Sequence, residues 1–76
     1  MPHVIVKMYP GKTDAQKAEI AEALAAALMA SAGAAERAVS VSIEDVAQTD
    51  WESQVYRPEI VGRPETLFKK PGYSLP

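Results

Sequence analysis

Apolar and polar residues alternate in one short segment of the chain, and such alternation is typical of a strand with one buried face. In Ala38–Asp45, the residues at positions 39, 41 and 43 are valine or isoleucine and their neighbours are polar. The segment His3–Tyr9 is rich in β-branched residues, and Pro10 and Gly11 follow it. Because these residue types favour extended backbone and then a turn, we expect a strand in each segment.

Between these two segments, apolar residues recur at the spacing of an α-helix. Ile20, Leu24 and Leu28 follow one another at intervals of four positions, so they line one side of a helix. Ala21 and Ala25 widen this stripe to a band that can face a core. The pattern therefore predicts a helix with one buried side.

Residue types at both ends set the bounds of this helix. Thr13 and Gln16 have the spacing of a capping box, in which each side chain accepts a hydrogen bond from a backbone N–H. Gly33 can adopt the left-handed conformation that ends many helices. We therefore expect a helix over about Asp14–Ala32.

The part of the chain after the second strand is less regular. We expect a short helix over Trp51–Tyr56, capped by Asp50 and interrupted by Pro58. A second short helix is expected over Glu65–Lys70, following Pro64, because proline suits the first turn of a helix. Neither segment has enough periodicity to predict how it packs.

A strand, a long helix and a second strand make a βαβ unit with parallel strands. The expected fold class is thus α/β, with a single βαβ unit and short C-terminal helices in one domain over 1–76.

A two-stranded sheet is not stable alone, and a chain of 76 residues has a small core. Cysteine is absent and His3 is the only histidine, so neither disulfides nor a histidine metal cluster can compensate. We therefore expect a homo-oligomer, preferably a dimer, that completes the sheet.

Composition excludes several classes of function. Lys and Arg number 8 against 10 Asp and Glu, for a net charge of −2, and no basic stripe suggests nucleic acid. No apolar run reaches the roughly 20 residues that span a bilayer, and no signal peptide is recognisable at the start. We expect a cytoplasmic protein without a membrane partner.

Pro2 is the first candidate for chemistry, because it directly follows the initiator Met1. Small second residues permit removal of the methionine, which would leave proline as an amino-terminal secondary amine. An α-amino group has a pKa of about 7.7–8.0, and burial beside a cation lowers it. Such an amine can take a proton next to a carbonyl. Alternatively, Pro2 only starts an edge strand.

Two motifs at fixed spacing resemble the 4-oxalocrotonate tautomerase family. They are MPHVIVK at Met1–Lys7 and GKTDAQK at Gly11–Lys17. Members of that family have an N-terminal proline, a strand, a helix that starts Gly-Arg/Lys-Ser/Thr-x-x-Gln-Lys, and a second strand. The match covers about Pro2–Trp51, and the tail KKPGYS at Lys69–Ser74 resembles short bacterial members.

The resemblance implies roles for four residues. Pro2 matches the general base, and Lys12 falls where an arginine often binds a substrate carboxylate and polarises the carbonyl. Lysine keeps the charge but loses the bidentate fork. Ser40 aligns with a second arginine, so only its hydroxyl could bind an enol or carbonyl oxygen. Trp51 matches an aromatic residue of the apolar wall around the proline.

Each of these residues also has a structural interpretation. Lys12 could be a solvated charge on a loop, Ser40 the solvent face of a strand, and Trp51 part of a core. His3 is interpreted as structural, because its side chain should point to the opposite face of the strand from Pro2. Three arginines that could reach a site from a neighbouring subunit stay unassigned: Arg37, Arg57 and Arg63.

The resemblance implies a cofactor-independent tautomerase, an isomerase that interconverts keto and enol forms of 2-oxo acids. One alternative is a relative that uses the same amine for hydration or decarboxylation, although such enzymes generally need further carboxylates or arginines. The other is a non-catalytic oligomeric binding module. That alternative fits a chain that keeps Met1, because the nitrogen of Pro2 is then an amide without basicity.

Overall fold

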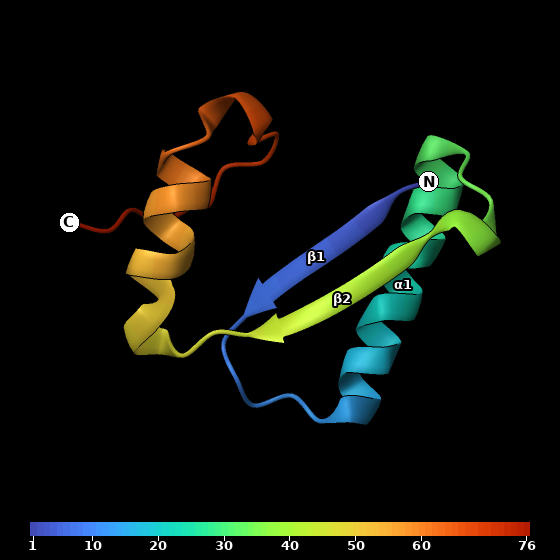
Figure 1. Ribbon diagram of the computed structural model, residues 1–76, viewed down its shortest axis with the longest axis horizontal. Coiled ribbons are helices and arrows are strands. Elements are labelled where there is room, and N and C mark those ends of the chain that lie inside the picture. The colour runs from blue at the N-terminus through green and yellow to red at the C-terminus, as the bar shows by residue number, and fades with distance from the viewer. The chain divides into compact units, whose positions relative to one another are not determined.

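The computed structural model describes all 76 residues, which form two compact units, residues 1–45 and 46–76 (Figure 1). In chain order, the first unit comprises β1 (His3–Met8), α1 (Asp14–Ala32), a short 3₁₀ helix η1 (Glu36–Ala38) and β2 (Ser40–Asp45). The second unit comprises three short helices, η2 (Gln48–Asp50), η3 (Glu52–Val61) and η4 (Pro64–Thr66). No helix combines the length and the apolar character needed to cross a bilayer.

The first unit is a βαβ unit, as predicted. β1 and β2 pair in parallel, from His3 opposite Ser40 to Met8 opposite Asp45, and α1 packs along the sheet, mainly against β2 (Figure 1). β2 starts two residues later than predicted. The reason is local, because the N–H of Val39 donates to the carbonyl oxygen of Glu36 over 3.2 Å and so completes η1 instead of the strand.

Both ends of α1 form as the sequence predicts. The Thr13 hydroxyl accepts from the Gln16 N–H over 3.1 Å, and the Gln16 side chain accepts from the Thr13 N–H over 2.9 Å. These two bonds satisfy backbone donors that have no partner inside the helix. At the other end Gly33 adopts φ 68° and ψ 21°, the left-handed conformation that a side chain would strain.

One side of α1 is half-buried and the other is exposed. The half-buried positions include the predicted stripe of Ile20, Leu24 and Leu28. On the same side, the Lys17 ammonium lies 3.1 Å from a carboxylate oxygen of Asp45, at the end of β2. The helix thus contacts the sheet face through apolar residues, with an ion pair at one end of the contact.

The second unit departs from the sequence prediction at Pro58. The helix does not stop there but continues to Val61 as a π-helix, in which hydrogen bonds join residues five apart. Proline removes only its own N–H bond from this pattern, and the N–H of Gly62 donates to the Arg57 carbonyl oxygen over 2.9 Å. A Cβ atom at Gly62 would lie 2.8 Å from that oxygen, so glycine permits the helix to close in this way.

The expected cap of the first short helix and the length of the second also differ from the prediction. Asp50 gives η3 no side-chain cap; instead, its carbonyl oxygen accepts from the Ser53 hydroxyl over 3.2 Å. The helix expected over Glu65–Lys70 is a single turn, η4, with Pro64 in its first turn as predicted. Both the N–H and the hydroxyl of Thr66 donate to one carbonyl oxygen, each over 3.1 Å, which closes a turn instead of propagating a helix.

We predict that Thr13→Ala lowers the free energy of unfolding by about 1 kcal/mol, because it removes one half of the capping box. Urea denaturation at a fixed protein concentration measures the change. Ser31→Ala is the matched control, since Ser31 is exposed in the same helix and caps neither end. Equal losses in the two variants would contradict a contribution from the cap.

Candidate functional site

Pro2 lies directly before β1, where the sheet holds its backbone. Its carbonyl oxygen accepts a hydrogen bond from the Ser40 N–H over 3.2 Å, and the residue is half-buried. Met1 is fully exposed, so its removal would break no buried contact. With Met1 attached, the Pro2 nitrogen is an amide, and only after removal is it an amine.

Ser40 and His3 lie side by side on the sheet face that α1 does not cover. They are opposite each other in the parallel register, and the Nδ1 atom of His3 lies 2.7 Å from the Ser40 hydroxyl oxygen. Ser40 therefore has two neighbours at the start of β1, namely Pro2 through its backbone and His3 through its side chain. The contact between Ser40 and His3 could not be predicted from the sequence, because it depends on the register of the strands.

The same face of the sheet carries an exposed apolar residue. Ile5 follows His3 on this face and keeps 54% of its surface exposed. Lys7 and Glu44, opposite each other in the register, end this row of side chains. Ile5, with charged and polar neighbours on this face, is thus accessible for contact with another chain.

Lys12 lies in the loop between β1 and α1 and is exposed. Pro2 precedes the first residue of β1, whereas Lys12 follows the last. The strand has six residues, so five steps of about 3.3 Å separate its first residue from its last, roughly 17 Å. The structure therefore does not bring Lys12 to Pro2 within one chain.

Trp51 belongs to the second unit, at the start of η3, and is half-buried. Its indole N–H donates to the hydroxyl oxygen of Tyr73 over 3.0 Å. The ring of Tyr73 in turn lies against that of Tyr56, with centroids 5.8 Å apart and planes tilted by 32°. The contact of Tyr73 with Trp51 could not be predicted from the sequence, because no local spacing connects residues 22 positions apart.

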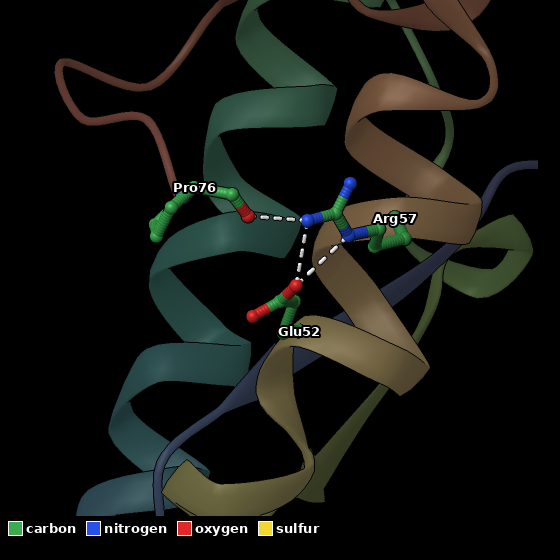
Figure 2. A network of polar contacts seen from close by, with 3 residues as sticks. All are labelled: Glu52, Arg57 and Pro76. Atoms are coloured by element: carbon green, nitrogen blue, oxygen red, sulfur yellow. Dashed lines mark hydrogen bonds and ion pairs between the residues drawn. The ribbon is translucent and has the colours of Figure 1, made fainter.

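The three unassigned arginines differ in their surroundings. The Arg57 guanidinium binds the Glu52 carboxylate through Nε and Nη2, over 2.9 and 2.7 Å, and also donates to the carbonyl oxygen of Pro76 (Figure 2). Its charge is therefore already matched inside the second unit. Arg37 in η1 and Arg63 before η4 are exposed, so either is open to a ligand or a partner.

Comparison with known proteins identifies the family. The family model of the tautomerase enzymes, which describes the sequences of that family, matches residues 2–58 of the chain. The chain belongs to the tautomerase family. The match starts at Pro2 and includes Lys12, Ser40 and Trp51, and the βαβ unit is the fold expected of this family.

Individual tautomerases are similar over nearly the whole chain. A probable tautomerase of Xylella fastidiosa (strain 9a5c) is 48% identical over 74 residues, which cover 97% of this chain and 90% of that protein. Tautomerase PptA of Enterobacter sp. (strain 638) is 38% identical over 76 residues, covering 99% and 100%. Tautomerase PptA of Pectobacterium carotovorum subsp. carotovorum (strain PC1) is 40% identical over 75 residues, covering 97% and 99%. These matches confirm the resemblance seen in the motifs, and they place this tautomerase among the isomerases.

Proposed function

We propose that this tautomerase interconverts the keto and enol forms of 2-oxo acids, with the amine of Pro2 as general base after Met1 is removed. The observation that carries this proposal is the position of Pro2. It is the first residue of the family match, its carbonyl is held by the Ser40 N–H, and the neighbouring Met1 is fully exposed.

The proposed reaction needs only a proton transfer. The unprotonated amine of Pro2 takes the proton of the enol hydroxyl, and the carbonyl forms as the C=C electron pair moves to a carbon. The resulting ammonium then returns the proton to that carbon, so no oxidant or cofactor is consumed. Apolar surroundings keep such an amine unprotonated. For Trp51 we propose a role in binding the apolar part of the substrate.

Lys12 would hold the substrate carboxylate, but it must then come from another chain. Antiparallel pairing of two β1 strands about a two-fold axis places the start of one strand beside the end of the other. This pairing would bring Lys12 of the partner subunit to Pro2. It would also extend the two-stranded sheet to four strands, which a unit of this size needs for stability. We therefore propose a homodimer with two shared sites.

Ser40 would limit the substrate to one carboxylate. A hydroxyl can hydrogen-bond an enol or carbonyl oxygen, but it brings no positive charge to a second carboxylate. A carboxylate that leaves water without a cation costs several kcal/mol. We therefore propose that enols of aryl or alkyl 2-oxo monoacids are preferred over extended diacids.

We predict that Pro2→Ala lowers kcat for an enolised 2-oxo acid by about 10²–10⁴-fold, the range of general acid–base catalysis. Alanine keeps a primary amine, so some activity should remain. Ultraviolet absorbance of the enol follows the reaction, and intact mass verifies that Met1 is absent. Pro10→Ala, at an exposed proline, is the matched control and should keep the parental rate. A parent that retains Met1 and still turns over the enol would refute the role of the amine.

We predict that mixing two weak variants, Pro2→Ala and Lys12→Ala, restores activity. In a heterodimer, one site combines an intact Pro2 with an intact Lys12, whereas the other site lacks both. Random pairing gives about half heterodimers, hence about one quarter of the parental activity. The measurement compares the mixture, after joint unfolding and refolding, with each variant treated alone. Activity equal to the mean of the two variants would exclude a shared site.

We predict that Ser40→Arg shifts the preference of the enzyme toward dicarboxylate enols. The added guanidinium could pair with the second carboxylate, so kcat/KM should rise for the diacid relative to the monoacid. Ser42→Arg is the control, because it adds the same charge two residues further along β2. In parallel, Lys12→Ala should raise KM for both substrates. A parent that already prefers the diacid and is insensitive to Lys12→Ala would contradict the carboxylate assignment.

A further inference from the structure

A chain of three aromatic residues in the second unit connects Trp51 to a rigid support. Tyr56 is buried in η3, with 7% of its surface exposed, and belongs to the core of this unit. Tyr73 lies in the C-terminal tail, and its ring packs against that of Tyr56. The hydroxyl of Tyr73 accepts the hydrogen bond of the Trp51 indole N–H over 3.0 Å. The position of the indole is thus tied to the core through Tyr73.

The geometry restricts the indole in a way that packing alone does not. A half-buried indole N–H needs an acceptor, and this one bond fixes which edge of the ring points toward the tail. The acceptor is itself fixed, because the tilted contact with Tyr56 holds the ring that carries it. Without the hydroxyl, the indole would lose this hydrogen bond while the phenyl ring still filled the space.

We propose that Tyr73 is a positioning residue, which holds the indole of Trp51 in the orientation that binds the apolar part of the substrate. This inference rests on the role proposed above for Trp51. It assigns a function to a residue of the C-terminal tail. It also implies that substrates with aryl side groups depend on Tyr73 more than substrates with a methyl group.

Tyr73→Phe tests the proposal, because it removes the hydroxyl and keeps the ring on Tyr56. Trp51 is the only tryptophan of the chain, so a ¹⁵N-labelled sample gives a single indole N–H signal in a two-dimensional NMR spectrum. We expect this signal to shift and its exchange with solvent to accelerate in Tyr73→Phe. Tyr56→Phe is the matched control, since it removes a hydroxyl from the same cluster that does not accept the indole bond.

Kinetics on the same variants then test the consequence for the substrate. We expect Tyr73→Phe to raise KM for an aryl enol acid by about 2- to 10-fold, the effect of one net hydrogen bond. The kcat value and the KM for an enol acid with a methyl group should change little, and Tyr56→Phe should resemble the parent in both. These values separate positioning from a general loss of structure, which would lower kcat for both substrates.

Two results would overturn the proposal. An unchanged indole signal in Tyr73→Phe would show that the hydroxyl does not hold Trp51. A shifted signal with parental KM for the aryl substrate would show that the orientation of Trp51 does not matter for binding. Neither result bears on the proposed general base. That role is tested separately by Pro2→Ala, a variant in which Trp51 and Tyr73 are both kept.

Discussion

The parallel pairing of β1 with β2 is the interaction on which the rest of the first unit depends. Its register decides which side chains meet α1 and which face away, because a slip by one residue would exchange the two faces. The same register puts the Ser40 N–H on the Pro2 carbonyl and the Ser40 hydroxyl on His3. The candidate base and its polar neighbours are thus fixed by a ladder of only two strands.

Local rules predicted the first unit well, because its elements are determined by neighbouring residues. Thr13 and Gln16 interact across three positions, and Gly33 needs only its own conformational freedom, so both ends of α1 follow from the sequence. The β-branched residues of the first strand and the alternation in the second likewise predicted the βαβ order. The start of β2 was misplaced because the N–H groups of Ala38 and Val39 donate to the carbonyl oxygens of Ala35 and Glu36, and so form a turn in place of the first residues of the strand.

The second unit was predicted poorly, because its structure depends on contacts between distant residues. Pro58 is a strong signal against an α-helix, but the sequence does not reveal that a π-helix, closed at Gly62, accommodates it. The bond from Trp51 to Tyr73 joins residues whose separation carries no periodic signal. Of the candidate site, Pro2, Lys12, Ser40 and Trp51 were found through the family pattern. His3 and Tyr73 acquire their significance only from the three-dimensional contacts.

The size of the chain and the layout of the candidate site point to the same requirement. Two strands leave both sheet edges open, and a sheet of this kind gains stability when further strands pair with it. One of these open edges belongs to β1, and β1 also separates Pro2 from Lys12. In the proposed dimer, one contact therefore stabilises the fold and assembles the site. Dilution that separates the subunits would then remove stability and activity together, since both follow the same association equilibrium.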